Sequence, residues 1–287
     1  MKTTERVRAI LNAPGIQAVP GCYDGLSTLL TKQADFPLAF ISGGGVAATR
    51  FGLPDVGMVA GSEMADTVRA IATGVPDYPF IADGDQGYGN AMNVRRTVVE
   101  YARAGAAGIM LEDQVMPKRC GHLSNKEVVS RREARLRIRA AVEARTESGL
   151  DIIIMAKTDA LAVHGFDEAL SRMLDFQEEG ADLLLLEAMT TEAEMEAFLK
   201  AVEKPACANN FAGGKTPYLQ RDRLEQIGFK LFIDPTLMMA TMHTLQQHLR
   251  AFAANDESSY PSRVSFKDMM TVLGHGTHTE IEERYRS

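Results

Sequence analysis

The chain has 287 residues, of which 45% are hydrophobic and 24% charged, and a formal net charge of −7. This composition is typical of a globular protein with a large core, and the acidic balance disfavours nucleic acid and anionic membranes, which recruit clustered Lys and Arg. The apolar runs DIIIMA and DLLLLEA are too short to span a bilayer, and MKTTERVRAI lacks a signal-peptide core. We therefore expect a single cytoplasmic domain over residues 1–287 with a small-molecule ligand.

Short apolar runs alternate with longer stretches of helical spacing along the whole chain. After a first helix around residues 3–12, the runs fall at 17–21, 37–44, 78–85, 107–113, 151–159, 181–188, 205–210 and 229–235. The stretches that follow them cover 25–33, 62–72, 93–105, 130–144, 166–180, 191–202, 219–228 and 236–252. Residues 255–287 lie outside this repeat and form a tail.

The apolar runs are nearly continuous, as is typical of strands in a parallel sheet that is covered on both faces. Eight such strand and helix repeats predict a (β/α)8 barrel with an extra amino-terminal helix. An open doubly wound sheet is the alternative.

Polar residues occur where the apolar runs stop. In a parallel barrel all strands end on one face, where catalytic groups collect. A cluster of hard oxygen ligands without histidine favours Mg²⁺, or Mn²⁺, over zinc. The alternative is that some of these side chains cap helices or pair with arginines. The residues are Ser42, Asp83, Asp85, Glu112, Asp113, Lys157, Asp159, Glu187, Asn209, Asn210 and Asp234.

The segment VMPKRCGHLSNK, residues 115–126, is too long and too charged for a simple connection after the fourth strand. It is a candidate active-site lid. Lys118, Arg119 and His122 would favour a thiolate at Cys120 and lower its pKa, which suits an acid that protonates a carbanion. A surface loop whose cations offset the acidic protein is the alternative. The three cysteines form neither a disulfide framework nor a CxxC pattern, so we expect reduced thiols.

Several motifs in order along the chain resemble the isocitrate lyase and phosphoenolpyruvate mutase superfamily, nearest to its 2-methylisocitrate lyase-like branch. The motifs are ISGGGVAATRFGLPDVG, ADGDQGYGN, AGIMLEDQ, KRCGH, AKTDALAV and GGKTP. The resemblance implies a (β/α)8 barrel, a carboxy-terminal helical tail exchanged between subunits, and a homotetramer that acts on a small carboxylate.

The resemblance also implies roles for individual residues. It places Mg²⁺ near Asp83, Asp85 and Glu112, partly through water. The remaining positions are the substrate-binding Ser42, Gly43, Gly44, Gly121, Glu187 and Asn209, and the catalytic Asp55, Cys120, His122 and Lys157. Ser42 to Gly44 would form a glycine-rich turn that binds an anion. The implied reaction is a retro-aldol cleavage in which Cys120 protonates the carbanion, giving pyruvate or glyoxylate and an acid such as succinate.

The chain departs from this branch at four positions. Lys157 stands where close methylisocitrate lyases usually carry arginine, and Phe40 where they carry tyrosine. Ala212 replaces a glutamate found in many relatives, and Ala240 falls where tricarboxylate-cleaving members place arginine. Lysine lacks the bidentate fork that grips a carboxylate. We therefore expect a smaller substrate, such as a substituted malate.

Two further functions stay open. One is hydrolysis or decarboxylation of oxaloacetate, or phosphonopyruvate chemistry, within the same superfamily; the thiol in the lid counts against the phosphonopyruvate enzymes. The other is a non-catalytic paralogue that binds a carboxylate, since a fold alone never establishes an activity.

Overall fold

The computed structural model describes residues 1–121 and 123–286, and its chain divides into two compact units, residues 1–238 and 239–287. The first unit contains eight parallel strands that pair in the order β6-β5-β4-β3-β2-β1-β8-β7. The strands are β1 (Gln17–Cys22), β2 (Ala39–Ile41), β3 (Phe80–Asp83), β4 (Gly108–Glu112), β5 (Ile153–Thr158), β6 (Leu183–Leu186), β7 (Cys207–Asn209) and β8 (Leu231–Asp234).

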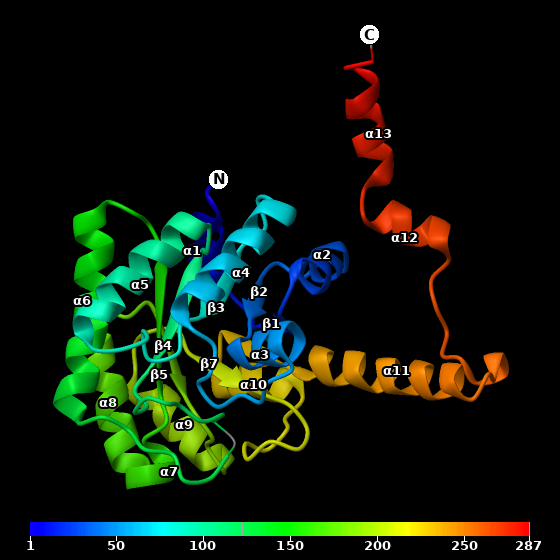
Figure 1. Cartoon of the computed structure of the whole chain (residues 1–287). Helices are drawn as coiled ribbons and strands as arrows, with labels where there is room; N and C mark the ends of the chain where they lie inside the picture. Colours follow the sequence, from blue (N-terminus) through cyan, green and yellow to red (C-terminus); the bar gives the residue numbers. More distant parts are fainter. Residues whose placement is uncertain (122, 287) are drawn as a thin grey trace. The chain divides into compact units, whose positions relative to one another are not determined.

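The sheet closes on itself. A parallel bridge between Leu184 and Ala206 joins β6 to the start of β7, and the Leu184 N–H donates to Pro205 O at 3.0 Å. Helices surround the strands (Figure 1), which confirms the predicted (β/α)8 barrel. The helices of this unit are α1 (Thr3–Asn12), α2 (Gly25–Gln33), α3 (Gly43–Phe51), α4 (Gly61–Gly74), α5 (Ala91–Ala104), α6 (Arg131–Ser148), α7 (Leu161–His164), α8 (Phe166–Glu178), α9 (Glu192–Ala201) and α10 (Arg221–Ile227).

Polar residues just before the helices explain where several of them begin. The side chains of Asp24, Asn90, Ser130 and Thr191 each accept a hydrogen bond from a backbone N–H in the first turn of the following helix. Such caps satisfy donors that have no partner within the helix.

The core has two layers because strand side chains alternate between opposite faces. On β5, Ile154 and Ala156 pack outward with the helices, whereas Ile153 and Met155 join a cluster inside the barrel. Val7 and Leu11 of α1 belong to that inner cluster, so the first helix packs against the barrel interior. The alternation determines which polar residues at the strand ends face the mouth of the barrel.

The glycine-rich stretch after β2 differs from the prediction. Instead of a non-helical loop, it forms the first residues of helix α3. Ser42 is the N-cap, and its Oγ accepts a hydrogen bond from the Gly45 N–H at 3.1 Å. Glycine lowers helix propensity by only about 1 kcal/mol per residue, which a cap and tertiary contacts offset. The short α7 was also not expected from the sequence.

The second unit is helical. It contains most of α11 (Thr236–Ala253), followed by the 3-10 helix η1 (Glu257–Ser259), α12 (Phe266–Val272) and α13 (His275–Glu283). The Tyr260 ring contacts the ring of His248, with centroids 4.7 Å apart, and the Arg263 guanidinium. Large apolar side chains of α11 are exposed, among them Met242, Leu245, Leu249 and Phe252.

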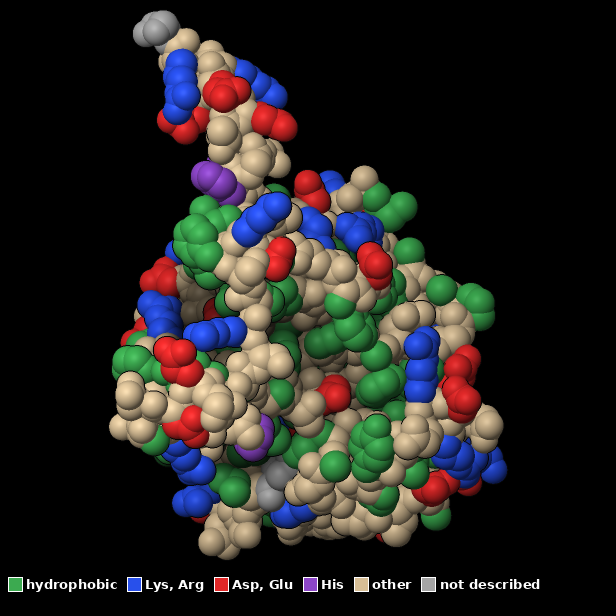
Figure 2. Space-filling view, turned by 90° about the vertical axis from the view of Figure 1, so that its right-hand side faces the viewer, with side chains coloured by type: hydrophobic (Ala, Val, Ile, Leu, Met, Phe, Trp, Pro, Cys, Tyr) green, Lys and Arg blue, Asp and Glu red, His purple; other side chains and the backbone are tan. Residues whose placement is uncertain are grey.

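Among the described residues, no helix has the length and apolarity needed to cross a membrane. On the face shown in Figure 2, acidic and basic side chains are interspersed, with exposed hydrophobic side chains between them.

Candidate active site

Polar side chains occupy the mouth of the barrel because they continue the inward-facing rows of the strands. Phe40, Ile81, Met110, Met155 and Leu185 lie in the inner cluster. Two residues further along each chain segment, the next inward positions are Ser42, Asp83, Glu112, Lys157 and Glu187. Cys207 leads to Asn209 in the same way.

The start of α3 lies against one side of this mouth. The Gly43 N–H donates to Asp83 Oδ2 at 3.2 Å, and a Cβ on Gly43 would lie 2.8 Å from the same oxygen. A Cβ on Gly44 would lie 3.0 Å from Asp55 Cγ. A side chain at Gly43 would therefore displace the Asp83 carboxylate, and one at Gly44 would press on Asp55.

Asp83, Asp85 and Asp55 are linked through hydrogen bonds and a buried lysine. The Asp85 N–H donates to Asp83 Oδ1 at 3.0 Å. Lys118 Nζ, on the loop after β4, lies 2.6 Å from Asp55 Oδ1 and 3.1 Å from Asp85 Oδ1. The positive charge of Lys118, expected from the sequence to act on the Cys120 thiol, is therefore paired with two carboxylates.

A second group of charges lies across the mouth. The Lys157 ammonium donates to Glu112 Oε2 and to Asp159 Oδ2, and it lies 3.6 Å from Glu187 Oε2. Asn209 Nδ2 donates to Glu187 Oε2 at 2.9 Å. Lys157 is thus held by three carboxylates of the chain itself.

Burial changes the acidity of two carboxyl groups. Burial raises the pKa of Asp85 to about 6, although Lys118 lowers it. Burial likewise raises the pKa of Glu112 to about 8, against the opposing effect of Lys157. Shifts of this size toward neutral pH are common at functional sites.

The donor set fits a hard divalent cation. Among the described residues no hydrogen bond reaches Glu112 Oε1, and Asp85 Oδ1 accepts none either, although Lys118 Nζ is near. Within the same residues, no three acidic, histidine or cysteine side chains converge closely enough to hold a metal by themselves. Asp83 already accepts two N–H bonds, so Asp85 and Glu112 offer the available oxygens, with water completing the coordination of an Mg²⁺-like ion.

The loop between β4 and α6 reaches the same place. The Cys120 N–H donates to Asp55 O at 3.2 Å, and a Cβ on Gly121 would lie 2.7 Å from Glu187 Oε2. Cys120 is partly buried, whereas Cys22 and Cys207 are fully buried. His122, predicted to be catalytic, lies outside the described residues.

Other polar residues at the strand ends have structural partners. Asp113 faces outward and accepts from Thr158 Oγ1, Asp159 N–H and Arg172. The Asn210 side chain makes two hydrogen bonds with the backbone of Leu219, and Asp234 Oδ1 accepts from Thr236 N–H. The sequence grouped these residues with the mouth, and their side chains instead stabilise the connections around it.

The sequence did not identify Gln114 and Lys126 as parts of the site. Both side chains contact Asp159, from positions 45 and 33 residues away in sequence. A lysine in a charged loop gave no signal of burial, because lysines in loops are usually exposed.

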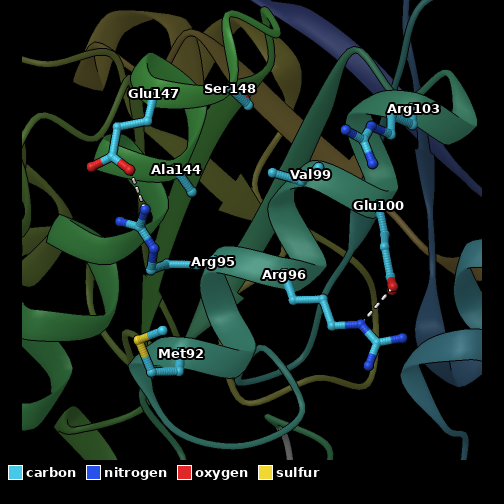
Figure 3. A pocket seen from close by; sticks show the side chains of 9 residues that line it. All are labelled: Met92, Arg95, Arg96, Val99, Glu100, Arg103, Ala144, Glu147 and Ser148. Atoms are coloured by element: carbon cyan, nitrogen blue, oxygen red, sulfur yellow. Dashed lines mark hydrogen bonds and ion pairs between the residues drawn. The ribbon is translucent and has the colours of Figure 1, made fainter.

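A separate groove of about 630 Å³ lies outside the barrel between α5 and α6 (Figure 3). Arg95 pairs with Glu147, and Arg96 pairs with Glu100 at 2.7 Å. These charges compensate one another, and the residues that line the groove belong to α5 and α6 and include none of the candidate site residues, so the groove is not part of the candidate site.

Comparisons with known proteins identify the family of the chain. The phosphoenolpyruvate phosphomutase family model matches residues 7–253. A 2,3-dimethylmalate lyase of Eubacterium barkeri is 37% identical over 290 residues, covering 99% of either chain. A 2-methylisocitrate lyase of Escherichia coli (strain K12) is 40% identical over 243 residues, covering 84% of this chain and 81% of the relative.

Solved structures show the same fold. An oxaloacetate acetylhydrolase in complex with 3,3-difluorooxalacetate superposes with a TM-score of 0.93 at 32% identity, covering 98% of this chain and 96% of the other. A phosphonopyruvate hydrolase complex with oxalate and Mg²⁺ has a TM-score of 0.85 at 28% identity, covering 99% of each. The chain therefore belongs to the phosphoenolpyruvate mutase and isocitrate lyase superfamily, in which its close homologues are named lyases.

Proposed function

We propose that this protein is a Mg²⁺-dependent carbon–carbon lyase that cleaves a 2-hydroxy dicarboxylate of the substituted malate class by retro-aldol chemistry. The observation that carries the proposal is Glu112 Oε1, a buried carboxylate oxygen at the barrel mouth that no described donor reaches, close to the loop that carries Cys120.

The chain's own residues supply the binding and proton-transfer steps. Asp85 and Glu112 would hold the cation, and two N–H groups orient the Asp83 carboxylate beside Asp85. When bound, a divalent cation polarises the oxygen on the carbon that becomes the carbonyl. At the start of α3 the Gly43 N–H is held by Asp83 and the Gly45 N–H by Ser42 Oγ, which leaves the Gly44 N–H to bind a substrate carboxylate. A base removes the hydroxyl proton, the C–C bond breaks, and Cys120 protonates the carbon that receives the electron pair.

The contacts of Lys157 favour a substrate with two carboxylates over one with three. A tricarboxylate needs a cation for its third carboxylate, and arginine suits that role because of its bidentate fork. Here the Lys157 ammonium contacts Glu112, Asp159 and Glu187. A third substrate carboxylate would have to displace these buried partners, so a substrate that lacks it fits better.

The proposed assembly is a homotetramer in which the tail packs on another copy. Met242, Leu245, Leu249 and Phe252 recur at intervals of three and four residues on α11 and are 49%, 57%, 62% and 67% exposed. Such a stripe normally packs against another surface. Light scattering at micromolar concentration should report four chains, and a monomer would contradict this assembly.

Purified protein with Mg²⁺ should release pyruvate from 2,3-dimethylmalate faster than from 2-methylisocitrate, and faster than it releases glyoxylate from isocitrate. Oxaloacetate completes the substrate panel, and EDTA-treated protein is the control. The variant Cys120→Ser should lose most turnover of hydroxy acids, because serine is a much weaker acid than cysteine.

The panel separates the competing functions. Turnover of oxaloacetate alone would replace the lyase by a hydrolase or decarboxylase, a function favoured by the similarity to the oxaloacetate acetylhydrolase structure. No turnover of any member, together with Mg²⁺-dependent binding of oxalate, would indicate a carboxylate-binding paralogue.

A further inference from the structure

Two side chains hold the backbone on either side of Cys120. Before it, Gln114 Nε2 donates to Arg119 O at 2.8 Å and Gln114 Oε1 accepts from Arg119 N–H at 2.9 Å. After it, Lys126 Nζ donates to Gly121 O at 2.5 Å. Cys120 is therefore the single residue between two fixed peptide segments, on a loop that would otherwise have considerable freedom.

These two supporting side chains, Gln114 and Lys126, also contact one carboxylate, that of Asp159 at the carboxyl end of β5. Asp159 Oδ1 lies 2.6 Å from Lys126 Nζ, and Asp159 Oδ2 accepts from Gln114 Nε2 at 3.1 Å and from Lys157 Nζ at 2.9 Å. Asp159 is fully buried. Burial would raise its pKa, but the Lys157 and Lys126 ammonium groups outweigh that effect and lower the pKa to about 2. Asp159 is thus a fixed anion at neutral pH.

The burial of Lys126 indicates that its contacts matter for the loop. Its side chain is 1% exposed, although it comes from a connecting loop. Burying an ammonium group is costly unless it is paired and hydrogen-bonded, and here the paired groups are Asp159 and the Gly121 carbonyl. By contrast, Lys215 also donates to this loop, at Leu123 O over 3.2 Å, but from an exposed position.

We propose that Asp159, Lys126 and Gln114 form a positioning unit that fixes the Cys120 thiol at the barrel mouth and ties it to Lys157. The three residues act through the backbone of the loop and through Lys157. The catalytic consequence rests on the proposed lyase function, whereas the effect on the position of the thiol does not.

The reactivity of Cys120 measures this position directly. Because Cys22 and Cys207 are 0% exposed, alkylation of the folded protein by iodoacetamide reports Cys120, and Cys120→Ser supplies the blank rate. The test variants are Lys126→Met and Gln114→Leu, each of which removes one support and leaves Asp159 with two other partners. Lys215→Met is the matched control, since it removes a lysine contact with the same loop.

The supports should lower the rate of alkylation and raise the rate of turnover. We expect Lys126→Met and Gln114→Leu to increase the alkylation rate about tenfold, because the released loop opens more often. In the lyase assay their kcat should fall about 100-fold with little change in KM, as expected for a misplaced proton donor. Lys215→Met should stay within about twofold of the parent in both assays.

The result that would overturn the proposal is a Lys126→Met protein with a native circular dichroism spectrum and an unchanged alkylation rate. If that variant does not fold, Gln114→Leu decides by the same criterion, because it removes no charge. A parent protein that cleaves none of the hydroxy acids would overturn the proposed function alone, since the comparison of alkylation rates needs no turnover.

Discussion

Glu112 and Asp113 are adjacent buried carboxyl groups at the end of β4, and they face opposite sides of the barrel wall. Asp113 lies on the helix side, where Thr158, Asp159 N–H and Arg172 saturate its oxygens. Glu112 lies on the mouth side, where no described donor reaches one of its oxygens. The protein itself supplies hydrogen bonds to both oxygens of the outer carboxylate, whereas one oxygen of the inner carboxylate remains available for the cation that we propose.

The largest expected effect is the loss of activity on substitution of Glu112, the inner carboxylate. Glu112→Gln keeps the shape of the side chain but removes the charge that the cation needs. We expect kcat/KM to fall about 1,000-fold, corresponding to several kcal/mol of lost stabilisation of the transition state. Calorimetric titration should show weaker Mg²⁺ binding, while the melting temperature without metal stays the same or rises. A metal-free protein that is strongly destabilised by this change would remove the contrast with Asp113.

The outer carboxylate should show the opposite pattern. Asp113→Asn removes the buried carboxylate that lies 3.0 Å from the buried Arg172 guanidinium, which keeps only the more exposed Glu168 as a charged partner. Removing one member of a buried ion pair costs about 3 kcal/mol or more. Urea unfolding should report this loss, while Mg²⁺ affinity at low temperature stays within about threefold of the parent. A large loss of Mg²⁺ affinity with unchanged stability would place Asp113 in the site instead.

The metal-free protein should become less stable as the pH rises from 6 to 9. The pKa of Glu112 rises from its ordinary 4.5 to about 8 on folding, mainly through burial, so the proton binds the folded state more tightly. The resulting stabilisation is fully present below pH 4.5 and is lost as the pH rises through about 8. Melting temperatures measured in EDTA should therefore fall over this range.

Two controls sharpen the pH experiment. In Glu112→Gln the melting temperature should fall less between pH 7 and 9, because this variant lacks the titrating carboxyl group. Saturating Mg²⁺ should also reduce it, since the cation replaces the proton and its binding tightens as the pH rises. If the melting temperature of Glu112→Gln fell as steeply as that of the parent, another group would be responsible for the titration.

The sequence predicted the barrel and most of the mouth because both follow from local patterns. The eight apolar runs become the eight strands, and polar residues at their ends converge wherever parallel strands share an edge. Strand alternation also separates Glu112 from Asp113, although the sequence interpretation grouped them. The pairing of Lys118 with Asp55 and Asp85, and of Lys126 with Asp159, could not be predicted, because it depends on the path of a long loop between distant segments.

The smallest effect should come from a charge pair that resembles neither carboxylate of β4. Arg96 and Glu100 pair at 2.7 Å on α5, one turn apart, with side chains 77% and 36% exposed. Exposed pairs at this spacing contribute about 0.3–0.5 kcal/mol because water and salt screen them. Glu100→Gln should therefore shift the urea midpoint only slightly, and less in 1 M salt. If Glu100→Gln lost nearly as much unfolding free energy as Asp113→Asn, burial would not determine how much a charge pair contributes to the stability of this barrel.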